Sequence, residues 1–114
     1  MISEEKFEAA RQKLGELLRE DPGNGNAYFY LGQIADQVGE LQDAYEHYQQ
    51  ASQTVSNPPW IRAWSLVRMG KFLAFQDQFD QARLRFEEAL KFEGELRGAR
   101  VRAEEALIKL PRRE

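Results

Sequence analysis

The sequence has no cysteine, a single histidine and no long apolar run. Without cysteine there is no disulfide framework, no thiol nucleophile and no thiolate metal site. No window comes near the ~18 consecutive apolar residues of a membrane-spanning helix, so we expect no membrane partner. His47 lies among glutamate and glutamine, where we expect it to face solvent rather than to bind a metal or act in catalysis.

A concentrated basic face is also missing. The 114 residues carry a net charge of −3, which argues against a nucleic-acid partner. The charges are unevenly divided, because residues 1–60 hold ten acidic and four basic side chains while residues 61–114 hold nine acidic and twelve basic ones. We interpret this asymmetry as solvated helix faces of different composition.

The usual arrangements of catalytic residues are absent as well. Glu87-Glu88 and Glu104-Glu105 are adjacent pairs, and adjacent side chains on a helix diverge instead of meeting in a cleft. Gly23-Asn24-Gly25 is typical of a turn, and no glycine-rich phosphate loop follows a strand. We therefore expect a protein that is not an enzyme and needs no cofactor.

The first residues are acidic and polar, which is not typical of a signal peptide. We expect a cytoplasmic location. A domain cut from a larger, exported protein would have the same composition.

Apolar residues recur at helical spacing almost throughout, and β-branched residues are few, which predicts an all-α protein. Turn-forming residues divide the chain, since proline cannot continue a helix interior. We expect helices over about 3–20, with Ser3 as a possible cap, and over 26–38, 40–54, 60–75 and 79–92. After that, Gly94 and Gly98 leave two alternatives: a separate sixth helix, which we favour, or one helix over 79–110.

Four residue types recur in the same order at one spacing. Gly32, Ala44, Tyr48 and Ala51 are followed 38 residues later by Gly70, Ala82, Phe86 and Ala89. Such a period marks a repeat architecture, in which each unit needs its neighbours to bury its apolar face. The small residues let helices approach closely and the aromatic residues fill the wider gaps. This pattern predicts a binding surface rather than a catalytic pocket.

In full, the first unit reads Tyr28-x2-Leu31-Gly32-x2-Ala35, then Ala44-x3-Tyr48-x2-Ala51, and the second reads Leu66-x2-Met69-Gly70-x2-Leu73, then Ala82-x3-Phe86-x2-Ala89. These units resemble the tetratricopeptide repeat, a helix–turn–helix unit of about 34 residues. The resemblance covers about residues 7–92. It departs from the family pattern where Asp77 replaces the glycine between two helices and where Gly94 replaces a proline.

The resemblance implies an all-α, right-handed α-solenoid of about six helices in antiparallel pairs. We divide its single domain into a half-repeat helix over 1–22, a first repeat over 24–57 and a second over 60–94. The segment 95–110 then forms a C-terminal capping helix.

In this family the first helix of each pair lines a concave groove, so the resemblance places partner contacts on residues 26–38 and 60–75. We expect Phe29, Trp64 and Phe75 to act as apolar anchors on faces that the repeat packing does not use. The alternative is that the C-terminal helix folds over these groups as a cap. The predicted contact residues are Asn26, Phe29, Tyr30, Gln33, Trp64, Val67, Arg68, Lys71 and Phe75, and Asp36, Gln37 and Ala74 share the same faces.

The resemblance implies a non-catalytic module that binds a protein or peptide, for example as a co-chaperone or as a secretion or assembly adaptor. The alternative is a self-associating domain whose groove or helix edge forms a homo-oligomer. The lysine–asparagine clamp for acidic chaperone tails is missing, since Phe29 and Gln33 hold its places, although Arg68 and Lys71 can still hold one carboxylate.

Basic residues gather near the C-terminus. We interpret them first as an exposed helix face and second as a site for an anionic partner. They are Arg97, Arg100, Arg102, Lys109, Arg112 and Arg113.

Overall fold

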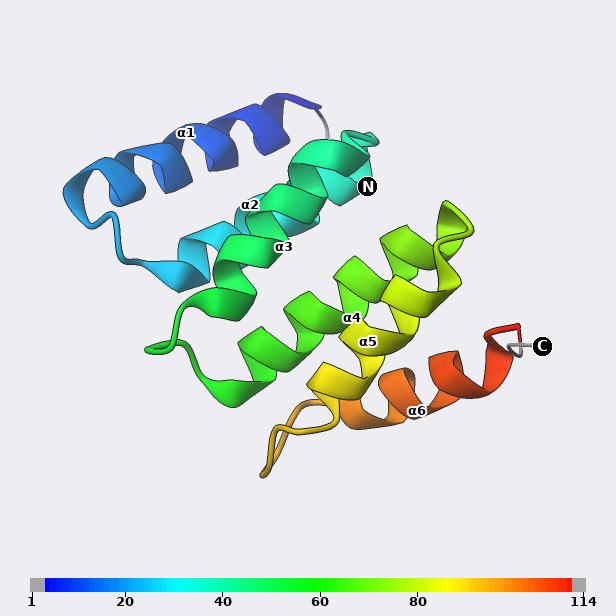
Figure 1. The fold of residues 1–114 in the computed structure, drawn as a ribbon. Helices are drawn as coiled ribbons and strands as arrows, with labels where there is room; N and C mark the ends of the chain where they lie inside the picture. Colours follow the sequence, from blue (N-terminus) through cyan, green and yellow to red (C-terminus); the bar gives the residue numbers. More distant parts are fainter. Residues whose placement is uncertain (1–3, 112–114) are drawn as a thin grey trace.

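The computed structural model describes residues 4–111, which hold six helices and no strand. The helices are α1 (Glu4–Glu20), α2 (Gly25–Val38), α3 (Leu41–Gln53), α4 (Pro59–Phe75), α5 (Phe79–Ala89) and α6 (Ala99–Lys109) (Figure 1). The predicted all-α class is confirmed, and the expected ranges of the first four helices agree closely with the observed ones. Ser3, the expected cap of α1, lies outside the described residues.

Helix starts follow from local chemistry at two of the predicted breaks. The side-chain oxygen of Asn24 accepts a hydrogen bond from the Ala27 backbone N–H at 3.2 Å and so caps α2. Pro59 lies in the first turn of α4, where its missing N–H removes no helical hydrogen bond. Between these starts, the buried Asn57 side chain donates to the Ala51 carbonyl at 2.9 Å and fixes the linker from α3 to α4.

The helices pack mainly on their neighbours in sequence. In this stack α2 packs on α3, α4 packs on α5, and the two pairs meet through α3 and α4. At one end α1 packs on α2, and at the other α6 packs on both α4 and α5 (Figure 1). The result is an elongated molecule of 46 × 28 × 22 Å, as expected when each repeat contacts only adjacent units.

One packing contact recurs in both helix pairs. In the first pair the ring of Tyr48 lies against Gly32, and in the second the ring of Phe86 lies against Gly70. A Cβ atom added at Gly32 or Gly70 would come within 2.8 Å or 2.6 Å of the ring. The predicted pairing of small residues with aromatic ones is therefore confirmed, and the ring lies directly on the glycine rather than beside it.

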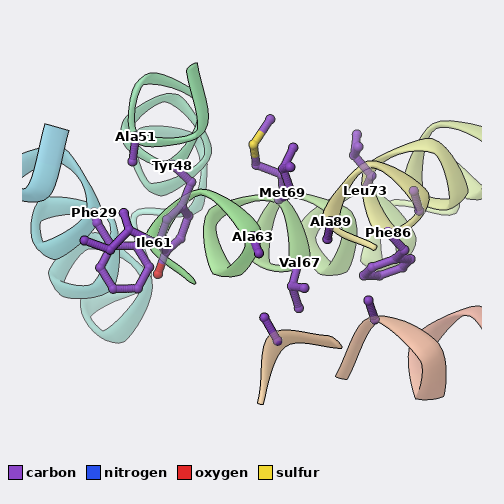
Figure 2. Close-up of a cluster of buried hydrophobic side chains, with 14 of the residues drawn as sticks. Phe29, Tyr48, Ala51, Ile61, Ala63, Val67, Met69, Leu73, Phe86 and Ala89 are labelled. Carbon is purple, nitrogen blue, oxygen red and sulfur yellow. The ribbon is translucent and has the colours of Figure 1, made fainter. Parts of the chain in front are cut away.

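The core runs along both faces of α4. Figure 2 shows Ala63 and Met69 on this helix, with Tyr48 and Ala51 of α3 on one side and Phe86 and Ala89 of α5 on the other. Alanine lets the backbones of these helices come close, because it adds only one methyl group at each contact.

The linker from α5 to α6 settles the choice between one long helix and two helices. At Gly94 and Gly98 the φ angles are +89° and +88°, so the chain leaves the helical conformation at both positions. The single long helix is therefore wrong. The expected end of α5 at Phe92 is also wrong, since the helix ends at Ala89. Phe92 is instead held in the linker, where its carbonyl accepts a 2.8 Å hydrogen bond from Arg100. The C-terminal helix, expected from residue 95, begins instead at Ala99.

Candidate functional site

A groove separates α2 from α4. These two helices make few contacts with each other, because α2 packs mainly on α3, and α4 packs mainly on α5 and α3. Three hollows adjoin along the groove, and Arg68 lines all of them. The middle hollow shares Gln33 with one neighbour and Asp36 with the other. The groove is therefore continuous from one end of the two helices to the other.

We name the two outer hollows after one residue of each. The Trp64 hollow is lined by Phe29, Tyr30, Gln33, Trp60, Trp64, Arg68 and Arg97. The Tyr48 hollow is lined by Asp36, Leu41, Ala44, Tyr45, Tyr48, Arg68, Lys71, Phe72 and Phe75.

The nine predicted contact residues differ widely in exposure. Phe29 and Val67 are buried. The exposed residues are Asn26, Tyr30, Lys71 and Phe75, and the half-buried ones are Gln33, Trp64 and Arg68. Asn26 and Val67 line none of the three hollows, and the other seven residues line at least one.

The expectation that Phe29 is accessible is wrong. Only 4% of this residue is exposed, because three aromatic rings pack against it. The ring centroids of Tyr30, Tyr48 and Trp60 lie 5.6, 5.9 and 5.7 Å from that of Phe29. Trp60 meets Phe29 edge to face from the first turn of α4, a common geometry for packed aromatic pairs. Phe29 thus belongs to the contact between the two repeats.

The expectation that Val67 is accessible is also wrong, and here the C-terminal segment is the cause. Val67 is 1% exposed, and Figure 2 shows its side chain directed toward the segment that contains α6. The Trp64 indole N–H donates a 3.0 Å hydrogen bond to the carbonyl of Arg97, which lies in the linker between α5 and α6. Phe75, in contrast, is 79% exposed. The C-terminal segment therefore covers only one end of the predicted surface.

Arg97 closes the groove at that covered end. Its guanidinium lies 3.9 Å from the ring centroid of Trp60, within the range of a cation–π contact. Its backbone N–H donates to the Glu95 carboxylate at 2.7 Å, and its φ angle is +52°. From the sequence, Arg97 was assigned only to an exposed basic set. The two tryptophan residues that it contacts lie more than thirty residues earlier in the chain.

The remaining members of that basic set differ in role. Arg102 and Lys109 are exposed on α6, as the first interpretation expects, whereas Arg100 is half-buried and bound to the linker. Arg112 and Arg113 lie outside the described residues.

Tyr48, Tyr45 and Phe72 are groove residues that sequence reasoning did not assign to the site. Tyr48 was expected only as a packing residue, yet it lines both the middle hollow and the Tyr48 hollow. Tyr45 and Phe72 approach each other with ring centroids 5.2 Å apart. The available signal was their helical spacing: Tyr45 precedes Tyr48 by one turn, and Phe72 follows Arg68 by one turn.

Tyr48 in the groove and His47 on the same helix both have pKa values shifted by burial. Burial raises the pKa of the Tyr48 phenol, the Asp36 carboxylate raises it further, and Arg68 opposes the shift. Burial lowers the pKa of His47 below 6.5, although Asp43 and Glu46 oppose this shift. The expectation that His47 faces solvent is wrong in part, because its half-buried ring stacks on Tyr28 with centroids 6.4 Å apart.

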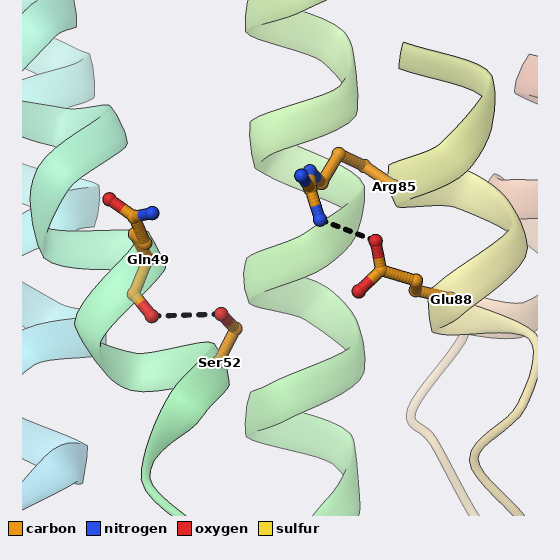
Figure 3. A network of polar contacts seen from close by, with 4 residues as sticks. All are labelled: Gln49, Ser52, Arg85 and Glu88. Atoms are coloured by element: carbon orange, nitrogen blue, oxygen red, sulfur yellow. Dashed lines mark hydrogen bonds and ion pairs between the residues drawn. The ribbon is translucent and has the colours of Figure 1, made fainter. Parts of the chain in front are cut away.

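On the opposite face of α4, polar contacts lie within α3, within α5 and between α3 and α4. Figure 3 shows the Ser52 hydroxyl donating to the Gln49 carbonyl of α3, and Arg85 paired with Glu88 on α5. The Arg62 guanidinium donates from Nε to the Ser52 carbonyl at 2.9 Å and so joins α4 to α3. These contacts join helix to helix or one turn to the next, and we assign them a structural role.

Neither a metal site nor a membrane span is found in the described part of the chain. Within residues 4–111, no three histidine or acidic side chains gather as metal ligands would. None of the helices described there has the length and apolar character needed to cross a membrane.

Stacked helix pairs, a recurring glycine–aromatic contact and a groove between alternate helices together define a helical repeat protein. A family model of the tetratricopeptide repeat matches residues 1–69, which include α1 to α3 and most of α4. The chain belongs to the tetratricopeptide repeat family. Repeats of this family generally mediate protein–protein interactions and are typically non-catalytic scaffolds. No curated protein matches the sequence.

Proposed function

We propose that the chain binds a segment of a partner protein along the groove between α2 and α4. The observation that carries this proposal is the continuity of the three hollows around Arg68. A row of adjoining hollows suits an extended polypeptide, whose successive side chains can enter one hollow after another. The general role of the family in protein–protein interaction supports the same proposal.

The groove offers the residue types that dominate binding energies. Aromatic residues and arginine are enriched among the residues whose truncation weakens protein complexes most. With Phe29 in the core, the accessible aromatic side chains among the predicted contact residues are Tyr30, Trp64 and Phe75, and Arg68 lies between the last two along α4. Its guanidinium is 5.7 Å from the Trp64 ring centroid, so the arginine is already positioned in the groove.

Selection from a phage-displayed library of random peptides tests this proposal without a known partner. Selected peptides are synthesised, and their affinities are measured by calorimetry. We expect Arg68→Glu to weaken binding at least about tenfold, because the central cation becomes an anion. The control is Leu84→Glu on α5, an exposed residue that lines none of the hollows, and it leaves the affinity unchanged. Circular dichroism verifies that both variants are folded.

The proposal fails if selected peptides bind the Arg68→Glu variant as tightly as the unaltered protein. It also fails if no library peptide binds. A role as a co-chaperone or as an adaptor in secretion or assembly stays a prediction, and so does a cytoplasmic location, because both rest on the sequence alone.

A further inference from the structure

The Tyr48 hollow is the most apolar of the three hollows in the groove. Its volume is about 210 Å³, and Leu41, Tyr45, Phe72 and Phe75 supply large apolar side chains to its wall. Pockets that enclose a whole small molecule typically measure about 300–1,000 Å³. A hollow of this size and lining therefore suits one large apolar side chain of a partner.

A buried hydroxyl without a partner lies in the wall of this hollow. Tyr48 is only 2% exposed, and among the described residues its hydroxyl has no hydrogen-bond partner of ordinary geometry. Figure 2 shows the side chain projecting from α3 between α2 and α4. The Asp36 carboxylate raises the pKa of the phenol by its charge and by a weak hydrogen-bonding interaction, although no hydrogen bond of ordinary geometry joins the two groups. An unpaired hydroxyl in this position costs stability, which a polar group of a ligand would restore.

Two cations lie at the same hollow. Arg68 and Lys71 both line it, and in the part of the chain that the structure describes neither forms an ion pair. Asp36 is the one acidic residue in the lining, so the hollow has an excess of positive charge. A carboxylate is the charge that complements this lining, and hydrogen bonds between ionised groups are the stronger ones.

We propose that the Tyr48 hollow binds a segment of the partner protein in which a large apolar side chain lies within about three residues of a carboxylate. The apolar side chain enters between Tyr45 and Phe75, and the carboxylate binds Arg68 and Lys71. The Tyr48 hydroxyl bonds to a polar group of the same segment. This inference rests on the proposed function and adds the chemistry of the partner at one end of the groove.

The peptides selected from the random library test the charge at this site. We expect them to be enriched in Phe, Leu or Trp with Asp or Glu within three positions. Replacing that acid by its amide lowers the affinity for the unaltered protein about five- to tenfold. The same replacement has little effect on binding to a Lys71→Gln, Arg68→Gln double variant, since the charge partners are then missing.

Tyr48→Phe tests the hydroxyl separately from the fold. Removing a buried group that makes no hydrogen bond leaves the protein as stable as before or more stable. We nevertheless expect the Tyr48→Phe protein to bind a selected peptide about fivefold more weakly than the unaltered protein does. The control is Tyr28→Phe, which removes a hydroxyl from a residue that lines none of the three hollows and leaves the affinity unchanged.

Different outcomes overturn the two proposals. If peptides depend on Arg68 but lack the acid, and Tyr48→Phe binds them normally, this inference is wrong and the proposed function stands. If no peptide depends on Arg68, both are wrong. If the protein forms a dimer that Phe75→Glu dissociates, a second copy occupies the hollow and the inference is again wrong.

Discussion

Gly70 and Gly15 are both helical glycines, but only Gly70 faces an aromatic ring. A Cβ at Gly70 would lie 2.6 Å from Phe86, whereas nothing lies within 4 Å of a Cβ at Gly15. Overpacking costs about 1–3 kcal/mol, and alanine gains about 1 kcal/mol in helix propensity. We expect Gly70→Ala to lower the free energy of unfolding by up to about 2 kcal/mol and Gly15→Ala to raise it by up to about 1 kcal/mol. Urea denaturation measures both, and equal changes would contradict the role of the contact.

Asp77 occupies the turn position at which the first repeat has Gly39. Its φ angle is +62°, close to the +85° of Gly39, and side chains other than glycine are strained in this region. We expect Asp77→Gly to raise the free energy of unfolding by about 0.5–1 kcal/mol. Gly39→Ala is the reciprocal change and lowers it by about 1 kcal/mol. Thermal unfolding followed by circular dichroism measures both, and a destabilised Asp77→Gly protein would show that the turn carries no strain.

His47 makes stability depend on pH, because its pKa in the folded chain is below 6.5. Below pH 6.5 the unfolded chain binds a proton at His47 more readily than the folded chain, so the free energy of unfolding falls as the pH falls. We expect the difference in stability between the unaltered protein and His47→Gln to be constant above pH 7. Between pH 6.5 and pH 5 the unaltered protein then loses stability relative to His47→Gln. Urea titrations across this range test the prediction, and a difference that does not vary with pH would contradict it.

At the scale of helices, α6 acts as a cap with one buried face. Ala103 is fully buried where α6 packs on α4 and α5, while Val101 on the same helix is exposed. A charge buried without a partner is among the most destabilising changes, whereas exposed substitutions usually alter stability by about 0.5 kcal/mol or less. We expect Ala103→Asp to cost at least about 3 kcal/mol and Val101→Asp to have little effect. Chemical denaturation separates them, and similar losses would mean that α6 does not cover a core.

The helices and the repeated contacts were predictable, because both depend on residues close in sequence or one repeat apart. Pro22, Gly39 and the Pro58-Pro59 pair mark helix boundaries within a turn of where they occur. The pairing of Gly70 with Phe86 follows from the spacing of the repeat. The end of α5 was misplaced, because side chains from α4 and α6 hold Phe92 in the linker. The start of α6 was also misplaced, since it lies at Ala99, after the positive φ angle of Gly98, and not at residue 95.

The accessible part of the groove was harder to predict, since it depends on contacts between distant elements. Phe29 lies on the predicted face of α2, but Trp60 from the next repeat buries it. Val67 is buried by a segment that begins about thirty residues later. The Tyr48 hollow includes side chains of α3, whereas the family resemblance places binding residues on the first helix of each pair. The division of the chain into repeats at residues 22, 57 and 94 stays a prediction.

For the molecule as a whole, the alternative to partner binding is self-association through its exposed apolar side chains. Phe75 in the groove and Val101 and Ile108 on α6 are all exposed, and uncovered apolar groups can also join two copies. If the groove serves another protein, we expect the chain to be a monomer. Static light scattering over an about tenfold range of concentration measures this, because mass action would make a dimer concentration-dependent. A dimer that persists at the lowest concentration would favour self-association.

The central claim is that the surface between α2 and α4 is where the partner binds. Its most direct test is an amide chemical-shift map of the labelled protein, titrated with a peptide selected from the random library. The account predicts that the largest shifts follow the groove, at Tyr30 and Gln33 of α2 and at Arg68, Lys71 and Phe75 of α4, with few on α1. Shifts concentrated on the outer face of α6, around Val101 and Ile108, would contradict it.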